Sequence, residues 1–187
     1  SFIGFVPYFT SCLRHETKPH AFSWLLWGCT GFAVYYGQSE HGAGAGGWVV
    51  LVESFLCTAV GLYAVFCGER KISNSDWLSL IFASIGIGMF IVLDNDTMAF
   101  TALAAVDLIA FYPTFRKTWQ SPYEEDMTVY LLSTLSLVVS CGALESYDFG
   151  TLFNLLVVIA VQVALVGMVF WRRYVVTNRY KFHCHMT

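Results

Sequence analysis

Two carboxyl groups stand in stretches of the sequence that are otherwise apolar. Asp107 lies in AAVDLIA and Glu53 lies in VVLVESF. Ionisable side chains in an apolar interior are costly, and in membrane proteins they mark functional sites. Because burial favours the protonated form of a carboxyl, either residue could carry a proton or bind a cationic or hydroxyl-bearing solute. The alternative for both is a protonated carboxyl that only links helices.

Two amides and an indole add to these carboxyls. Asn154 and Gln162 lie on the last apolar stretch, where an amide offers donors and acceptors without the cost of a charge. Trp24 and Trp27 are spaced to share one helix face and wall a pocket, although tryptophans near span ends more often form an interfacial belt. The substrate-binding residues that we predict are therefore Asp107, Glu53, Asn154, Gln162 and Trp24.

The sequence lacks the patterns of enzymatic chemistry. It has no Ser-His-Asp set, no paired catalytic carboxylates and no zinc motif, and its six cysteines are scattered without a CxxC. The FHCHM segment at 182–186 places two histidines around a cysteine, but a sequence of this kind is more typical of a disordered tail than of a metal site. We expect no catalytic residue, no cofactor and no metal, and the net charge of -3 argues against nucleic acid as a partner.

The composition indicates a protein that lies in a lipid bilayer. Hydrophobic residues make up 57% of the 187 residues and charged residues only 12%, with a mean hydropathy of +0.60. A soluble domain carries about 25% charged residues. Because a membrane-crossing helix needs about 20 mainly apolar residues, the sequence predicts six spans, at 22–37, 48–68, 77–93, 98–115, 127–144 and 152–171.

A seventh span is expected at residues 1–13. This segment is apolar but short, and the sequence does not begin with Met, so we expect that the first part of this helix precedes Ser1. Partial embedding in the membrane is the alternative.

The basic residues support a count of seven. With seven spans, every lysine and arginine falls in loops or a tail on one side, whereas the opposite loops hold only acidic residues. Cytoplasmic loops collect Lys and Arg, so we expect the N-terminus outside and the C-terminus in the cytoplasm. The ten basic residues are Arg14, Lys18, Arg70, Lys71, Arg116, Lys117, Arg172, Arg173, Arg179 and Lys181.

Two lookalike segments indicate an internal repeat. GFVPYF at 4–9 and AFYPTF at 110–115 share a Phe-x-Pro-x-Phe pattern and fall on spans 1 and 5, which run in the same direction. Proline in a helix removes a backbone donor and makes a kink or hinge. The four prolines, two per repeat, are therefore predicted hinge or gate residues near one mouth of the protein: Pro7 and Pro113 inside spans 1 and 5, Pro19 and Pro122 at the starts of spans 2 and 6.

The stretch VPYFTSCLRHETKPHAFSWLLWG resembles the PQ-loop pattern, and YPTFRKTWQSPYEEDMTVYLLS matches it less closely. The whole chain is similar to the SWEET and PQ-loop superfamily of small seven-helix transporters. The resemblance implies two parallel three-helix bundles joined by a linker helix, with a site between them near the midplane. The motif glutamine is absent, because Tyr8 and Thr114 follow the motif prolines.

The predicted architecture is all-α and integral to the membrane, in a 3+1+3 plan. The first bundle occupies 1–68, linker helix 4 occupies 69–96, the second bundle occupies 97–174, and a cytoplasmic tail occupies 175–187.

The function that we expect is transport of a small polar solute, such as a sugar or an amino acid, by alternating access of the two bundles. Proton coupling through the buried carboxyls would suit this function. The alternatives are a non-transporting accessory subunit of a larger membrane complex and a ligand-binding membrane receptor. Assembly into a homo-oligomer is open as well.

Overall fold

The computed structural model describes residues 2–69, 72–93 and 95–184, with side chains for residues 4–69, 72–93 and 95–177. Within these residues the chain forms seven α-helices and one short 3-10 helix, and no strand. The elements are α1 (Phe2–Leu13), α2 (Ala21–Glu40), η1 (Gly44–Gly46), α3 (Gly47–Cys67), α4 (Asn74–Val92), α5 (Asp96–Gln120), α6 (Thr128–Gly142) and α7 (Phe149–Cys184).

The helices follow the predicted apolar stretches, and α2 to α7 each begin within three residues of the predicted start. Two ends differ. Helix α5 continues to Gln120 and stops before Ser121, which precedes Pro122 and is therefore biased away from helix. Helix α7 continues to Cys184, through most of the segment predicted as a tail, because the sequence after Gly167 has no glycine or proline to end it.

Within the described part of the chain, four segments are long and apolar enough to cross a membrane: Gly44–Cys67, Asn74–Val92, Asp96–Gln120 and Phe149–Thr177. These four helices coincide with four of the six clear spans that the sequence predicts, and their length and composition suit membrane crossing. Helix α6 is apolar but has 15 residues, α1 has 12, and α2 contains Ser23, Thr30 and Gln38 within its 20 residues. Four such helices are typical of a multi-pass membrane protein.

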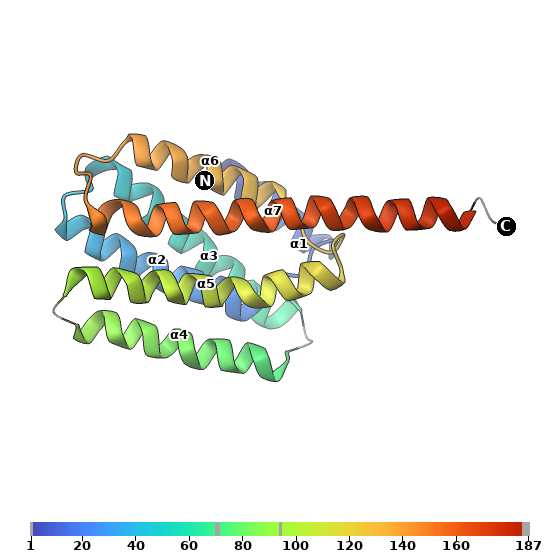
Figure 1. Ribbon diagram of the computed structural model, residues 1–187, viewed down its shortest axis with the longest axis horizontal. Helices are drawn as coiled ribbons and strands as arrows, with labels where there is room; N and C mark the ends of the chain where they lie inside the picture. Colours follow the sequence, from blue (N-terminus) through green and yellow to red (C-terminus); the bar gives the residue numbers. More distant parts are fainter. Residues whose placement is uncertain (1, 70–71, 94, 185–187) are drawn as a thin grey trace.

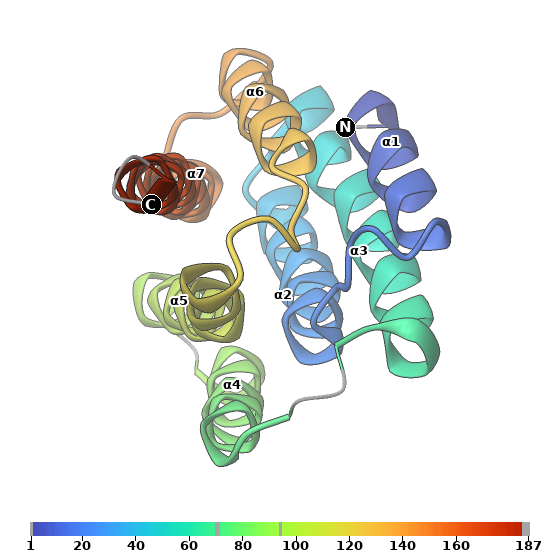
Figure 2. The same ribbon diagram turned by 90° about the vertical axis from the view of Figure 1, so that its right-hand side faces the viewer.

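The helices lie roughly along one direction, and α7 extends beyond the others (Figure 1). In the end-on view, α2 lies beside α3 and faces α5, while α6 lies between α1 and α7 (Figure 2). Helix α4 packs on α5 and touches α2. Helices α1, α2 and α3 therefore meet α5, α6 and α7 mainly through α1 with α6 and α2 with α5, with smaller contacts of α2 with α7 and α3 with α6.

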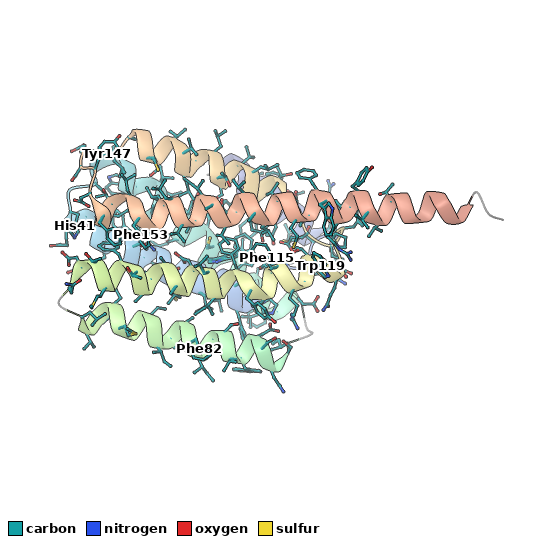
Figure 3. The ribbon with its side chains drawn as sticks, in the orientation of Figure 1. His41, Phe82, Phe115, Trp119, Tyr147 and Phe153 are labelled. Carbon is teal, nitrogen blue, oxygen red and sulfur yellow. The ribbon has the colours of Figure 1, made fainter. Side chains whose placement is uncertain are left out.

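The charged loops separate to opposite ends of the molecule. The basic end carries the α1–α2 and α5–α6 loops, where Lys117 contacts the carbonyl of Lys18 and the carboxylate of Glu125. At the acidic end, His41 Nε2 lies 3.3 Å from Oδ2 of Asp96, and His41 Nδ1 lies 3.5 Å from Oδ2 of Asp148. Figure 3 shows His41 and Tyr147 at this acidic end and Trp119 toward the other. The predicted basic residues 70 and 71 lie outside the described residues, as do the side chains of Arg179 and Lys181.

Glycines allow α2 and α3 to approach closely. A Cβ added at Gly61 would lie 2.7 Å from Leu25 Cδ2 and 2.9 Å from its backbone nitrogen, and one at Gly28 would lie 2.3 Å from Thr58 Oγ1. Small residues of this kind are typical of helix contacts in membranes, because they bring two backbones together. At Gly88 on α4, in contrast, an added Cβ meets nothing within 4 Å.

We expect Gly61→Ala to lower the melting temperature of the detergent-purified protein, because the new methyl group meets backbone that cannot move aside; overpacking of this kind costs about 1–3 kcal/mol. The matched control is Gly88→Ala, which should leave the melting temperature unchanged or raise it slightly, since alanine is the better helix former. Equal effects of the two substitutions would contradict the close α2–α3 packing.

Candidate functional site

A cavity of about 90 Å³ lies at the centre of the helices. Two hydrophobic clusters flank it. Phe5, Trp24 and Tyr130 belong to the cluster nearer the basic end, and Val34 and Leu155 belong to the cluster nearer the acidic end; all five also line the cavity. This space is large enough for several water molecules or one small solute.

All five predicted substrate-binding residues line this one cavity: Trp24, Glu53, Asp107, Asn154 and Gln162. Six helices supply the lining, namely α1, α2, α3, α5, α6 and α7, and no described residue of α4 takes part. The sequence therefore predicted the members of this polar group, and the structure shows that they surround a common space. Their role in binding stays a prediction.

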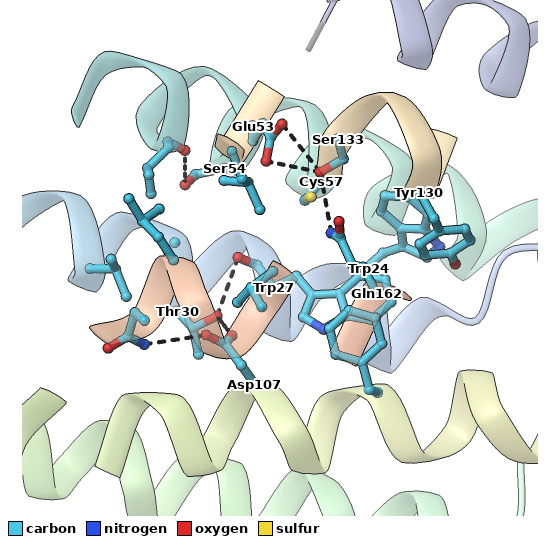
Figure 4. A pocket seen from close by; sticks show the side chains of 18 of the residues that line it. Trp24, Trp27, Thr30, Glu53, Ser54, Cys57, Asp107, Tyr130, Ser133 and Gln162 are labelled. Carbon is cyan, nitrogen blue, oxygen red and sulfur yellow. Dashed lines mark hydrogen bonds between the residues drawn. The ribbon is translucent and has the colours of Figure 1, made fainter. Parts of the chain in front are cut away.

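Asp107 forms one side of the cavity. Its side chain is 5% exposed, and Thr30 Oγ1 on α2 donates to its Oδ1 at 2.6 Å (Figure 4). The same Thr30 oxygen lies 3.0 Å from the carbonyl of Leu26. The hydroxyl can therefore donate to the Asp107 carboxylate, or it can donate to Leu26 and accept from a protonated Asp107. Both charge states of Asp107 are satisfied by this one neighbour.

Asn154 on α7 reaches the same region of α5 and is 2% exposed. In one orientation of its amide, Nδ2 lies 3.5 Å from Oδ2 of Asp107. In the orientation rotated by 180°, the nitrogen donates to the carbonyl of Phe100 at 3.1 Å and the oxygen accepts from the N–H of Ala104 at 3.3 Å. Rotation of one amide thus exchanges a contact with Asp107 for contacts with the backbone of α5.

Glu53 lies across the cavity from Asp107, within a second polar group (Figure 4). Ser133 Oγ on α6 lies 3.2 Å from both carboxylate oxygens of Glu53 and accepts from Gln162 Nε2 on α7 at 3.2 Å. Thr134 Oγ1 donates to Gln162 Oε1 at 2.7 Å. Hydrogen bonds therefore connect α3, α6 and α7 at the level of the cavity.

The sequence reasoning missed Thr30 and gave Ser133 only a local role, since serine and threonine in a helix commonly bond to their own backbone. A signal for Thr30 was available. Thr30 lies seven residues after Ser23, two helical turns along the same face. In the structure, Ser23 accepts a hydrogen bond from Thr114 at 3.2 Å. For Ser133 the deciding fact is the position of Glu53 on another helix, which no local pattern gives.

Aromatic rings form the cavity wall toward the basic end. The ring centroids of Trp27 and Phe111 are 4.4 Å apart, those of Trp24 and Trp27 are 5.2 Å apart, and Tyr130 lies 6.2 Å from both indoles. The Trp27 Nε1 atom is buried and has no acceptor among the described residues. The predicted interfacial role does not suit Trp24, which is 2% exposed at the centre of the protein.

The four prolines fall in two environments. Pro7 and Pro113 lie inside α1 and α5, as predicted. Pro19 lies in the loop before α2, and Pro122 lies in the α5–α6 loop, six residues before Thr128 at the start of α6. The predicted position of Pro122 at a helix start is therefore wrong, because residues 121–127 form turns in place of a first helical turn. The hinge role of all four stays a prediction.

A buried ionic group closes the packing at the basic end. Lys117 of α5 pairs with Glu125 of the α5–α6 loop, and their side chains are 5% and 2% exposed. Tyr8 of α1 donates to Glu125 Oε1 at 2.8 Å, and Tyr130 of α6 donates to the same oxygen at 3.2 Å. Arg173 of α7 donates to the Glu125 carbonyl at 2.8 Å. One loop residue therefore ties α1, α5, α6 and α7 together.

A second buried group attaches α4 to the same end. Arg116 Nη2 lies 2.8 Å from Oδ2 of Asp76, and His20 Nε2 lies 3.4 Å from that oxygen. Burial lowers the pKa of the His20 imidazole below its ordinary value, although the neighbouring Asp76 opposes this shift. The neutral form of His20 is therefore favoured at neutral pH, and Arg116 supplies the positive charge that Asp76 requires.

The described residues contain no cluster of three or more histidine, cysteine or acidic side chains placed to hold a metal ion. The last two residues of FHCHM, 185 and 186, lie outside the described part of the chain, as do the side chains of His183 and Cys184. The five cysteines with described side chains are free.

No protein-family model matches this chain, and neither does any curated protein or solved structure that was compared with it. The resemblance to the SWEET and PQ-loop superfamily therefore stays a prediction from its residues, and the proposed function must rest on the geometry.

We expect Lys117→Met to lower the stability of the protein by about 3 kcal/mol, because it leaves the Glu125 carboxylate buried without its cation. The double variant Lys117→Met/Glu125→Gln should regain part of this loss, which chemical or thermal unfolding in mild detergent would measure. Lys18→Met, at an exposed lysine of the same end, is the control. Additive losses in the double variant would contradict the ion pair.

Proposed function

We propose that this protein is a membrane transporter of a small polar solute, built from two parallel triplets of helices, α1–α3 and α5–α7, that α4 links. The pattern of helix contacts supports this plan. In this plan α1 corresponds to α5, and α2 corresponds to α6. The contact of α1 with α6 is then equivalent to the contact of α5 with α2, and both contacts are present. The α2–α3 contact corresponds in the same way to the α6–α7 contact. Parallel repeats of this kind occur in known transporters.

The observation that carries the proposal is the place of the polar cavity. It lies between the two triplets, each triplet supplies one carboxyl, Glu53 from α3 and Asp107 from α5, and the described residues of α4 do not line it. A central site between two repeats is what alternating access requires, because rocking of one triplet against the other exposes such a site to each side in turn.

Packed contacts at both ends of the cavity fit the roles of two gates. At the basic end, Tyr8, Lys117 and Glu125 join the two triplets across a buried ionic group. Toward the acidic end, Gln38 of α2 donates to the carbonyl of Thr151 on α7 at 2.8 Å and is fully buried. In the proposed cycle, opening to either side separates one of these contacts while the other holds.

The Asp107–Thr30 pair suits coupling of transport to protons. An ionised carboxylate in an apolar interior is costly unless it is neutralised. A proton can neutralise Asp107 when the site is empty, since the Thr30 hydroxyl accommodates both charge states. Solute and proton would then alternate at this carboxyl, and an opposite proton gradient would drive uptake.

We further propose that the basic end faces the cytoplasm, with the N-terminus outside and the C-terminus inside. Arg116, Lys117, Arg172 and Arg173 belong to the basic end, where their side chains contact carboxylates or the carbonyls of α5 and the α5–α6 loop. The acidic end has the pattern of an outer face.

Asp107→Asn should abolish solute uptake into proteoliposomes, because an amide cannot exchange a proton while it keeps nearly the same shape. Glu40→Gln, at an exposed carboxyl of the acidic end, is the matched control and should transport normally. Uptake by a folded Asp107→Asn protein at the unaltered rate would remove Asp107 from the mechanism.

Pro113→Ala should slow uptake several-fold and leave solute affinity nearly unchanged. Proline at this place deprives the carbonyl four residues earlier of its helical donor, so alanine restores the hydrogen bond and stiffens α5 beside the cavity. Initial rates measured over a range of solute concentrations separate the two effects. The exposed neighbour Tyr112→Phe serves as the control. A changed affinity at constant maximal rate would contradict a hinge at Pro113.

A further inference from the structure

We infer that Asp76 of α4 is the switch point of a pH-sensitive contact at the basic end. Asp76 pairs with Arg116 of α5 at neutral pH, and it takes protonated His20, at the start of α2, as its cation when the pH falls. His20 belongs to the first triplet and Arg116 to the second, so this exchange gives α4 a charged partner in the other triplet. The inference is independent of the proposed function, because these residues do not line the central cavity.

Asp76 lies where α4 meets both triplets. Helix α4 packs closely on α5 and also touches α2 (Figure 2). Asp76 is fully buried in the first turn of α4, and its Oδ2 lies 2.8 Å from Arg116 Nη2 and 3.4 Å from His20 Nε2. The backbone N–H of Ser73 donates to the same oxygen at 2.7 Å. One carboxylate oxygen therefore faces a cation of the second triplet and an imidazole of the first.

The hydrogen bonds of this group are incomplete. Six buried side-chain atoms of the described residues have no hydrogen-bond partner, and four of them belong to these three side chains: Asp76 Oδ1, Arg116 Nε, and Nδ1 and Nε2 of His20. Buried polar atoms without a partner are costly and uncommon. The His20 side chain is only 2% exposed, so it lies against Asp76 without a hydrogen bond to it. The group therefore has the donors and the acceptor for a second arrangement, in which His20 donates to Asp76.

A proton on His20 favours this second arrangement. Neutral imidazole has one N–H group, whereas imidazolium has two and a positive charge. Burial lowers the pKa of His20, Asp76 opposes this shift, and Arg116 and Lys117 add to it. His20 is therefore neutral while Arg116 holds Asp76, and a fall in pH selects the arrangement that binds the proton more tightly. Arg116, whose side chain is 24% exposed, can remain charged in water when His20 replaces it.

Other charged groups near His20 must be separated from Asp76. Asp76 faces the imidazole from α4, and Arg116 and Lys117 face it from α5. Glu69 of the α3–α4 loop is a further acid nearby, because its backbone N–H donates to the carbonyl of Pro19 at 3.0 Å. Residues 70 and 71 of the same loop lie outside the described residues. The experiment therefore includes a variant of Glu69.

The first comparison measures melting temperatures of the detergent-purified wild type and His20→Gln from about pH 7.5 to about pH 5.5, across the ordinary titration range of histidine. Because the pKa of His20 is lowered in the folded protein, the unfolded chain binds more protons in this range, and the wild type loses stability as the pH falls. We expect His20→Gln to gain about 2–4 °C on the wild type. His15→Asn, at an exposed histidine of the same end, should follow the wild type. A difference that does not change with pH overturns the inference.

Removal of Arg116 should reverse the sign of the response. In Arg116→Met the imidazolium, 3.4 Å from Asp76, replaces the guanidinium as its cation. The folded variant then binds the proton more tightly than the unfolded chain and gains stability as the pH falls. We expect its melting temperature to rise by about 2–4 °C relative to Arg116→Met/His20→Gln over the same range. Equal responses of these two variants would show that an acidic residue takes up the proton, and would overturn the role of His20.

A last variant identifies the acid that His20 pairs with. Arg116→Met/Glu69→Gln should keep the gain of stability at acid pH, because Asp76 is unaltered. Loss of the gain in this variant would make Glu69 the counter-charge and overturn Asp76 as the switch point. The comparison of the wild type with His20→Gln decides the inference even if Arg116→Met does not fold.

Discussion

An ionised carboxyl in an apolar helical interior must be neutralised, and this constraint governs the centre of the protein. Asp107 accepts a hydrogen bond from Thr30 and, in one orientation of the amide, from Asn154. Glu53 lies beside Ser133 within a hydrogen-bonded group that includes Gln162. None of these neighbours carries a charge. Asp107 therefore depends on a proton, or on a solute in the cavity, for its neutralisation.

The surrounding helices arrange this chemistry through unequal contacts. Helices α2 and α3 are joined by glycine-mediated packing that leaves no room for a methyl group at Gly61. The two triplets meet mainly through α1 with α6 and α2 with α5, across the cavity and the ionic group around Glu125. Helix α1 packs mainly on α6 of the other triplet, so apolar as well as polar contacts join the two triplets.

Sequence reasoning located the helices and the polar residues well because both signals are local. Apolar runs predicted the starts of α2 to α7 to within three residues. Asp107 was recognised from its local sequence alone, because a carboxyl in an apolar run stands out. Tertiary contacts were less accessible. Glu125 looked like one of several acids before a helix, but its partners are Tyr8, 117 residues away, and Lys117. The predicted position of Pro122 at a helix start was wrong because the α5–α6 turns depend on contacts with α7. These contacts include the hydrogen bond that Arg173 donates to the Pro122 carbonyl.

The most direct measurement of the central claim is the accessibility of Cys57, which lines the cavity from α3. In a variant that keeps this cysteine alone, a membrane-impermeant thiol reagent is added to either side of oriented proteoliposomes. Alternating access predicts labelling of Cys57 from both sides, with each rate reduced by a cavity ligand. Labelling from one side only, or from neither under conditions of active uptake, would contradict the account.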